Sequence, residues 1–285
     1  MKKSINHILV PTDFSGFSNR AFHFACEIAE RTGAKILLFH VVEPPYNFAT
    51  AVKGMMEMME KNALKRMKLL EEEADADVEI THDIRHGRTT REIINCVDRE
   101  GIDMVVMGSR GQSALSRAVL GSVSEIIAKD LSVPLFLIPY HEESENLDID
   151  IDTDIDFSTL VFATDLKPDD VAHLEYSKMF ATLFDATVLP AHFSPSSNFD
   201  ERIRLAGFIQ VLREETGDKT IDVEKITGDN FMKSLLEFVT QKDASAIIIN
   251  RYSKNVLQKL LQKDHTDDMV LHSDVPLLIL PPDRS

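Results

Sequence analysis

The chain has 285 residues, 44% of them hydrophobic and 27% charged, which is typical of a globular protein with one large domain or two of ordinary size. Its net charge of −16 argues against binding to nucleic acid, because most of the surface would repel the phosphates. No apolar run is long enough to form a signal peptide or to span a bilayer, and the two cysteines are too few for a disulfide framework. We therefore expect a cytoplasmic protein without a membrane or nucleic-acid partner.

In the first half, apolar strands alternate with amphipathic helices. The strand candidates, in chain order, are residues 8–10, 36–42, 78–87, 104–108 and 134–139. Most of them are nearly continuous apolar runs, which suits a parallel sheet covered on both faces. Residues 18–33 have helical periodicity and end at Gly33, a left-handed cap, whereas the helix over 89–101 opens with Thr89 and Glu92 at the spacing of a capping box. This alternation predicts a doubly wound α/β fold, which binds ligands beyond the carboxyl ends of its strands.

The segment after the second strand, residues 50–73, is rich in methionine. It contains Met55, Met56, Met58, Met59 and Met67. We favour a helix packed over the sheet. The alternatives are an adaptable surface for a protein partner and a mobile flap over a ligand, because methionine side chains adjust readily to different shapes.

The second half repeats the layout of the first. Equivalent positions keep a nearly constant spacing: Thr12 and Thr164 are 152 residues apart, as are His40 and His192, whereas Pro134 and Pro276 are 142 apart. The chain is thus an internal duplication whose second copy is ten residues shorter, and we expect the shortening in the region of residues 50–73. His40 and His192 fall at equivalent strand ends, which indicates a shared structural role.

An acidic segment separates the two copies. Residues 141–156 contain eight carboxylate side chains and no Lys or Arg, and like charges in such a run repel one another and stay solvated. We interpret this segment as a linker between a domain of residues 1–140 and a second domain of residues 157–285. We favour the linker over a cation site, and an edge strand formed by the Asp–Ile alternation remains the competing interpretation.

A glycine-rich stretch follows the fourth strand of the first copy. Gly108 and Gly111 let the backbone approach a ligand closely, and Gly121 with Ser122 begins the next helix. The free amides of a helix N-terminus form a natural phosphate site, to which the hydroxyls of Ser122 and Ser124 could also donate. The plain alternative is that Gly111 is only a turn and Ser122 only a helix cap.

The spacing of these glycines resembles the ATP-binding signature of the universal stress protein family. The resemblance extends to "VPTDFS" after the first strand, "HVV" at the end of the second and "VPLFLIP" as the last, so the whole chain resembles a tandem of two such domains. It implies two doubly wound domains, each with a mainly parallel five-stranded sheet in the order 3-2-1-4-5, flanked by helices. It further implies ATP, with or without Mg²⁺, bound across the carboxyl edge of the first sheet.

The resemblance assigns a role to each residue of the site. Asp13 would bond the ribose hydroxyls, the backbone of Val41 would meet the adenine, and Pro11 and Thr12 would line the base pocket. Met107, Gly108, Arg110 and Gly111 would follow the ribose and first phosphates, and Gly121, Ser122, Val123 and Ser124 would bind the distal phosphates. The alternative for Asp13 is a helix cap, because an Asp at a strand end often serves as one.

The second copy lacks the glycines. Asn250 replaces Gly108, Ser253 replaces Gly111, and Lys263 and Asp264 replace Gly121 and Ser122. Side chains at these points narrow the phosphate space, so we expect a structural or regulatory second domain without ATP. Binding of a different ligand in the duplicated pocket is the remaining alternative.

No motif of an efficient enzyme is present. A Walker lysine, a GxGxxG fingerprint, a GxSxG elbow and an HExxH motif are all absent from the sequence. His82 and His86 lie on a predicted strand, where four residues separate the side chains by roughly 13 Å, too far for a shared metal ion. We expect no catalytic residues and at most slow ATP hydrolysis.

These observations predict a cytoplasmic stress-response protein that binds nucleotide in its first domain and signals to an unknown protein partner. The last strand of each copy resembles the edge through which this family dimerises, so we expect the two domains to form a pseudo-dimer, with a homodimer as a further option. The alternatives are an interaction scaffold independent of nucleotide and a weak ATP hydrolase.

Overall fold

The structure, a computed structural model, describes residues 4–43, 52–74, 76–110, 121–139, 157–195, 198–251 and 275–282. The chain divides into two compact units, one containing most of the first half and the other most of residues 155–285. Several predicted features fall outside the described residues: Gly111, the acidic segment 141–156, Ser253, Lys263 and Asp264.

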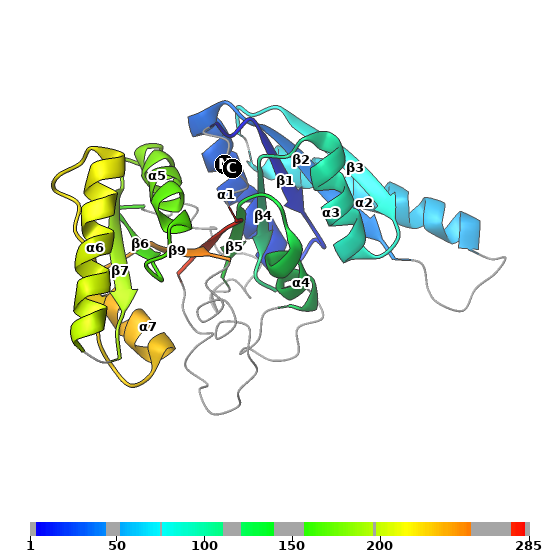
Figure 1. The fold of residues 1–285 in the computed structure, drawn as a ribbon. Coiled ribbons are helices and arrows are strands. Elements are labelled where there is room, and N and C mark those ends of the chain that lie inside the picture. Colours follow the sequence, from blue (N-terminus) through cyan, green and yellow to red (C-terminus); the bar gives the residue numbers. More distant parts are fainter. Residues whose placement is uncertain are drawn as a thin grey trace. The chain divides into compact units, whose positions relative to one another are not determined.

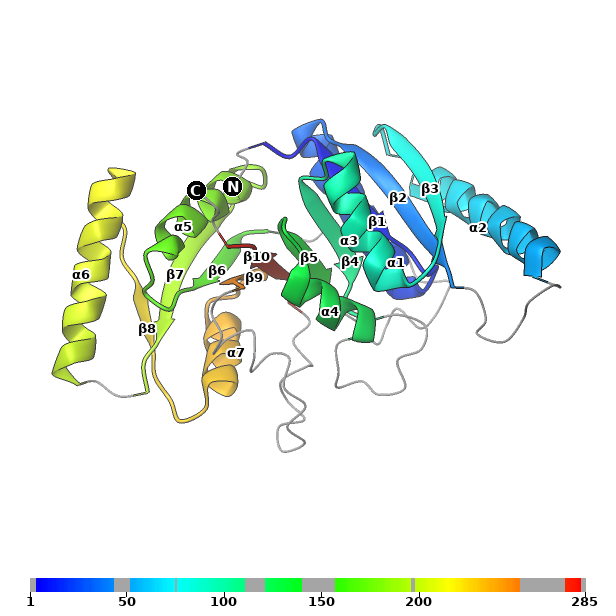
Figure 2. The ribbon, with the colours of Figure 1, turned by 45° about the vertical axis from the view of Figure 1, so that its right-hand side comes forward.

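The first half is a doubly wound α/β unit (Figure 1). Its elements are β1 (His7–Pro11), α1 (Gly16–Thr32), β2 (Lys35–Val42), α2 (Val52–Ala74), β3 (Ile80–His86), α3 (Thr89–Glu100), β4 (Met104–Gly108), α4 (Ser122–Asp130) and β5 (Leu135–Ile138). The strands are parallel and lie in the order β3-β2-β1-β4-β5. Helices α1 and α2 cover one face of the sheet, and α3 and α4 cover the other (Figure 2). The predicted strand order 3-2-1-4-5 is therefore confirmed.

The second half repeats this arrangement. It contains β6 (Thr159–Ala163), α5 (Asp169–Thr182), β7 (Thr187–Phe193), α6 (Phe199–Thr216), β8 (Glu224–Ile226), α7 (Phe231–Gln241), β9 (Ala246–Asn250) and β10 (Leu277–Leu280). The strand order β8-β7-β6-β9-β10 is again 3-2-1-4-5, and all the pairs are parallel.

The shortening of the second copy lies between its second and third strands. His40 of β2 pairs in register with Ile84 of β3, and His192 of β7 pairs with Lys225 of β8. The residues of the first pair are 44 apart in the sequence and those of the second are 33 apart. The helix in this region has 23 residues in the first half and 18 in the second. The expectation that the region of residues 50–73 accounts for the difference is confirmed.

The core of each half follows from the apolar strands. Ile8, Leu9 and Val10 of β1 are fully buried, because helices cover both faces of the sheet. Helix α1 begins after Ser15, whose hydroxyl accepts from the amide of Ser18, and ends at Gly33, which has a φ of 71° and forms the predicted left-handed cap.

The predicted capping box of α3 is wrong. The helix starts at Thr89, but both the amide and the hydroxyl of this residue donate to a carboxylate oxygen of Glu43, at 2.8 and 2.6 Å. Glu43 directly follows β2, so a residue 46 positions away in the sequence takes the place expected for Glu92.

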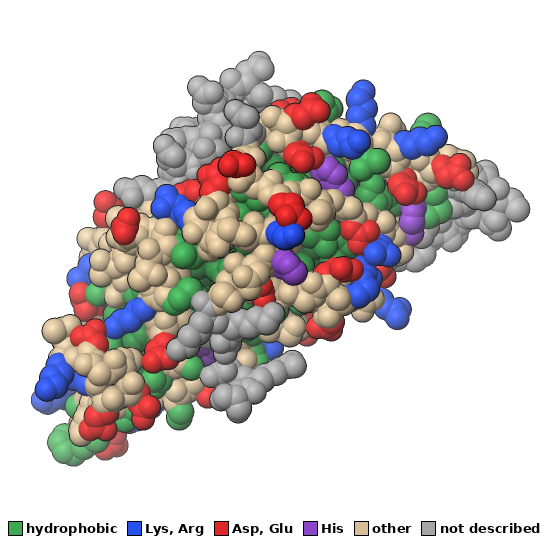
Figure 3. All heavy atoms as spheres, turned by 90° about the horizontal axis from the view of Figure 1, so that it is seen from above, with side chains coloured by type: hydrophobic (Ala, Val, Ile, Leu, Met, Phe, Trp, Pro, Cys, Tyr) green, Lys and Arg blue, Asp and Glu red, His purple; other side chains and the backbone are tan. Residues whose placement is uncertain are grey.

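One face of the described residues is mixed in charge (Figure 3). On the face shown in Figure 3, Lys and Arg side chains alternate with Asp and Glu side chains, so the described part of this face presents no basic stripe suited to nucleic acid. None of the described helices combines the length and apolar character needed to cross a membrane.

Candidate functional site

A pocket lies at the carboxyl ends of β1, β2 and β4 in the first half, with a cavity volume of about 140 Å³. Eleven of the twelve predicted site residues line it: Pro11, Thr12, Asp13, Val41, Met107, Gly108, Arg110, Gly121, Ser122, Val123 and Ser124. The twelfth, Gly111, lies outside the described residues. Residues more than 100 positions apart in the sequence thus meet at one sheet edge, as the strand order requires.

Five further residues line the same pocket and were not predicted from the sequence: Ser18, Phe39, His40, Thr89 and Ile93. Thr89 and Ile93 come from the first turns of α3, which connects β3 with β4 and so crosses the sheet near β1. The predicted strand order could have indicated these two residues. The helix that follows the edge strand β3 and leads to β4 begins at the carboxyl edge of the sheet, beside the pocket.

The loop after β1 is fixed by local hydrogen bonds. Oδ1 of Asp13 accepts from the amide and the hydroxyl of Ser15, at 3.0 and 2.6 Å. The hydroxyl of Thr12 accepts from the amide of Phe14 at 2.9 Å, and the amide of Thr12 donates to the carbonyl of Phe39 at 2.8 Å. Ser15, and not Asp13, is therefore the cap of α1. The half-buried Asp13 carboxylate lies at the pocket with its loop held in place on both sides.

The imidazole ring of His40 is neutral, and its hydrogen bond to a backbone carbonyl fixes its tautomer. Its Nδ1 lies 2.7 Å from the carbonyl oxygen of Thr12, which can only accept, so Nδ1 carries the proton. Burial lowers the pKa of His40, which leaves the ring neutral at pH 7 and Nε2 unprotonated. In the second half, Nδ1 of His192 lies 2.8 Å from the carbonyl oxygen of Thr164. The shared structural role expected for the two histidines is confirmed.

Gly108 occupies a position where a side chain fits only if its neighbours move by a few tenths of an ångström. A Cβ at this residue would lie 3.0 Å from Cβ of Phe17 and 3.1 Å from the carbonyl oxygen of Arg110, closer than ordinary van der Waals contact. The glycine therefore lets β4 end directly against the start of α1, beside the pocket.

The N-terminus of α4 borders the pocket on the other side. Its first intrahelical bond runs from the amide of Glu125 to the carbonyl of Gly121, which leaves the amides of residues 122–124 without intrahelical acceptors. The hydroxyl of Ser122 is exposed, but that of Ser124 is buried and donates to the carbonyl of Gly108 at 3.0 Å. The Ser124 hydroxyl thus donates within the domain in this structure, and its donation to a ligand stays a prediction.

A match to a known protein family identifies the kind of domain that the first half forms. The model of the universal stress protein family matches residues 4–139. The chain belongs to this family through its first half. Universal stress protein MJ0531 of Methanocaldococcus jannaschii is 29% identical over 138 residues, which cover 46% of this chain and 80% of the relative. Universal stress protein YxiE of Bacillus subtilis is 27% identical, over 47% of this chain and 98% of the relative.

A solved structure extends the likeness to both halves. A universal stress protein from Archaeoglobus fulgidus matches 98% of this chain and 97% of its own, with a TM-score of 0.70 and 20% identity. Both halves of the chain thus have the fold of a universal stress protein domain, and the recognition of a tandem is confirmed at the level of the fold.

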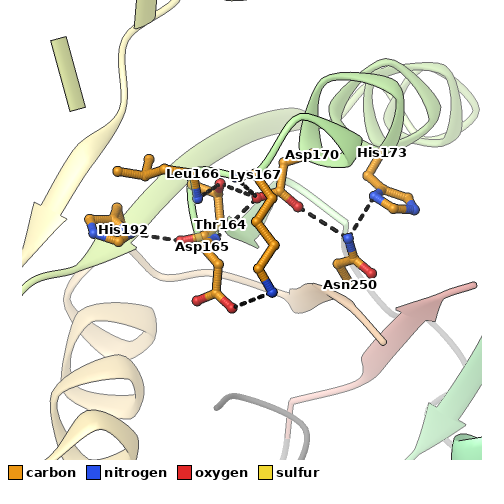
Figure 4. A network of polar contacts seen from close by, with 8 residues as sticks. All are labelled: Thr164, Asp165, Leu166, Lys167, Asp170, His173, His192 and Asn250. Atoms are coloured by element: carbon orange, nitrogen blue, oxygen red, sulfur yellow. Dashed lines mark hydrogen bonds and ion pairs between the residues drawn. The ribbon is translucent and has the colours of Figure 1, made fainter. Parts of the chain in front are cut away.

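In the second half, a polar network occupies the positions equivalent to the pocket (Figure 4). Asp170 is 1% exposed, and its Oδ2 accepts from the hydroxyl of Thr164 at 2.6 Å and from the amides of Asp165 and Lys167, each at 3.1 Å. Its Oδ1 accepts from the side-chain amide of Asn250 at 3.2 Å. A buried carboxylate with four donors is a satisfied group that stabilises the loop after β6.

Asn250 links this carboxylate to a buried histidine. Its side-chain amide lies 3.0 Å from Nδ1 of His173, whose Nε2 lies 2.7 Å from the carbonyl oxygen of Pro281. Because a carbonyl only accepts, Nε2 carries the proton and Nδ1 accepts from Asn250. The offset of 152 equates Asp170 and His173 with the smaller Ser18 and Ala21.

The described residues provide no metal site and no reactive thiol. They contain no group of three or more His, Cys, Asp or Glu that could ligate a metal ion. His82 and His86 lie on β3 as predicted, and each faces a separate glutamate of α2, Glu71 and Glu60. Burial raises the pKa of the two thiols to about 12 for Cys26 and about 11 for Cys96, so neither is a nucleophile at neutral pH.

Proposed function

We propose that the first domain binds an adenine nucleotide, ATP in the first instance, and that the protein acts in the stress response as a nucleotide-dependent module and not as an efficient enzyme. The observation that supports this most directly is the convergence of three features on one pocket: the Asp13 carboxylate, the glycine end of β4 and the free amides at the start of α4. A carboxylate can accept from two ribose hydroxyls, and backbone amides at a helix N-terminus attract phosphate.

We propose that the second domain takes no nucleotide in this manner. The residue equivalent to Gly108 is the buried Asn250, and the carboxylate of Asp170 lies within hydrogen-bond distance of it. Phosphate groups in that space would meet a buried negative charge and displace donors that this carboxylate needs. The stable network favours a structural or regulatory role.

The test is thermal melting of the full chain with and without Mg-ATP, for the wild type and for Gly121→Lys. A ligand at about 100 times its Kd stabilises the folded state by about 2.7 kcal/mol, which corresponds to a rise in Tm of roughly 5–10 °C for a domain of this size. We expect this rise in the wild type and its loss in Gly121→Lys, because the lysine side chain enters the space in front of the helix amides. The backbone of Gly121 has a φ of −59°, which any residue adopts without strain.

Gly207→Lys is the matched control. This residue lies on the exposed side of α6 with nothing within 4 Å of an added Cβ, so the same chemical change leaves the pocket untouched. The Tm of Gly207→Lys should rise with nucleotide as much as that of the wild type. No rise in any of the three proteins at millimolar ATP contradicts the proposal and favours a nucleotide-independent scaffold. Phosphate release that disappears in Gly121→Lys would instead indicate an ATP hydrolase.

A further inference from the structure

We infer that helix α2 is coupled to the nucleotide pocket through Arg66 and Phe14, so that nucleotide binding and the docking of α2 on the sheet strengthen each other. In this arrangement Arg66 is a positioning residue for the Asp13 loop, and α2 is the element whose behaviour reports the occupancy of the pocket. The inference rests on the proposed nucleotide binding.

Arg66 reaches from α2 to the loop after β1 by two contacts with the same residue. Its Nη2 donates to the carbonyl oxygen of Phe14 at 3.2 Å, and its Cζ lies 4.4 Å from the centroid of the Phe14 ring. A planar guanidinium can make both contacts at once, whereas an ammonium group cannot stack in this way.

Phe14 connects these contacts to the pocket. It lies next to Asp13 in the chain, its amide donates to the hydroxyl of Thr12, and its ring centroid lies 4.7 Å from that of His40. All three of these neighbours line the pocket. The backbone of Phe14 has a φ of 62°, a left-handed conformation that is unfavourable for a residue with a side chain and persists only where neighbours impose it.

The rest of α2 is attached by a narrow apolar stripe. Ala63, Met67 and Leu70 are buried, but Met55 and Met58 nearer the start of the helix are 39% and 57% exposed. An element with few buried apolar contacts opens locally at a small cost in free energy. Even a modest contribution of Arg66 to the stability of α2 therefore changes the local opening of this helix measurably.

The second domain provides an internal comparison. Leu166 takes the place of Phe14 with nearly the same φ, 59°, but it has no ring for an arginine to stack on. There the helix after the second strand is linked by Glu201, whose Oε1 lies 3.5 Å from Nε2 of His192. The contact between Arg66 and Phe14 is thus a feature of the domain that has the pocket.

The experiment is hydrogen–deuterium exchange of the α2 peptides in the full chain, with and without saturating Mg-ATP, in the wild type and in Arg66→Ala. Binding free energies couple reciprocally, so one coupling factor appears in both measurements. We expect ATP to slow the exchange of wild-type α2 by about fivefold, near the lower end of measured couplings. In Arg66→Ala this slowing is lost, and the Kd for ATP rises by about the same factor.

Two variants separate coupling from a purely structural effect. Lys65→Ala removes the same charge from the neighbouring exposed position and should keep both the slowing and the affinity. Arg66→Lys retains a donor without the planar stacking group, and we expect an intermediate result. If Arg66 only stabilised α2, Arg66→Ala would raise the exchange of α2 equally with and without ATP, and the difference between the two conditions would survive in this variant.

The failures of the two proposals are distinguishable. If wild-type protein melts higher with ATP but α2 exchanges at an unchanged rate, the coupling is wrong and the nucleotide site stands. The coupling is equally overturned if Arg66→Ala retains the ATP-dependent slowing. If ATP raises no melting temperature, the nucleotide site itself is wrong, and the coupling falls with it.

Discussion

At the scale of single residues, the contrast between Gly108 and Asn250 separates the two domains. Gly108 lines the pocket, and an added Cβ there would lie only 3.0 Å from Cβ of Phe17. Asn250 instead has a side chain that is 1% exposed and bonded to both Asp170 and His173. The same position at the end of the fourth strand thus serves an open pocket in one domain and a closed network in the other.

Asp170→Ala should destabilise the second domain by about 2–4 kcal/mol, because the substitution removes a buried carboxylate that accepts four hydrogen bonds. Asp200→Ala, at an exposed position of α6, should change the stability by less than about 0.5 kcal/mol. Urea denaturation of the full chain, together with hydrogen–deuterium exchange in peptides from residues 157–195, measures the effects of both substitutions. Equal effects of the two substitutions would contradict the importance of the network.

The sequence predicted this contrast only in part. The constant offsets correctly equate Thr12 with Thr164 and Gly108 with Asn250, and the loss of glycine at residue 250 follows from the sequence alone. The bonds that join Asp170, Asn250 and His173 span up to 80 residues, and their partners are chosen by the packing of α5 against β9. The inward turn of the Ser124 hydroxyl has the same origin, because its acceptor is the carbonyl of Gly108 on a neighbouring element.

At the scale of elements, among the helices described in both halves, the helix after the second strand differs most in length, with 23 residues in α2 and 18 in α6. The prediction that the methionine segment forms a helix over the sheet is confirmed for α2, whose Met67 is fully buried. The exposure of its first methionines could not be derived from periodicity, because it depends on where the sheet ends beneath the helix. The helix α3 starts at Thr89 as predicted, but its capping partner was mispredicted for a related reason, since Glu43 reaches it only through the pairing of β2 with β3.

Glu43→Gln should weaken the first turn of α3 in a manner that depends on pH. Side-chain and backbone hydrogen bonds from Thr89 lower the pKa of Glu43 below its ordinary value of 4.5. The folded state therefore favours the carboxylate, so its contribution is complete above pH 4.5 and is lost as the pH falls through the lower folded pKa.

We expect a loss of about 0.5 kcal/mol at pH 7, at the low end for helix caps because Glu43 is exposed. Below the folded pKa of Glu43, the stabilities of wild type and variant should converge. Chemical denaturation of both proteins between pH 3 and 7 measures this difference. A gap that stays constant over the whole range would show that the carboxylate charge plays no part.

At the scale of the whole molecule, the chain combines two copies of one fold with unequal sites. The five strands of each half lie in the order 3-2-1-4-5, which the family resemblance predicted. The pairing of the two domains into a pseudo-dimer, the homodimer and the protein partner stay predictions.

The unequal sites predict a stoichiometry of one nucleotide per chain. Isothermal titration of the full chain with ATP in the presence of Mg²⁺ should give a single class of sites with a stoichiometry close to one nucleotide per chain. Gly121→Lys should remove the heat of binding. A value close to two would show that the second domain also accepts nucleotide despite its network around Asp170.

The hydrogen bonds from His40 to Thr12 and from His192 to Thr164 are nearly identical, at 2.7 and 2.8 Å. Every molecule therefore contains the same loop twice, once beside a pocket and once beside a network that needs no ligand. In any titration, the loop after β6 serves as an internal reference that experiences the same temperature, buffer and protein concentration as the loop after β1. The ratio of their signals isolates the response to nucleotide without a second sample.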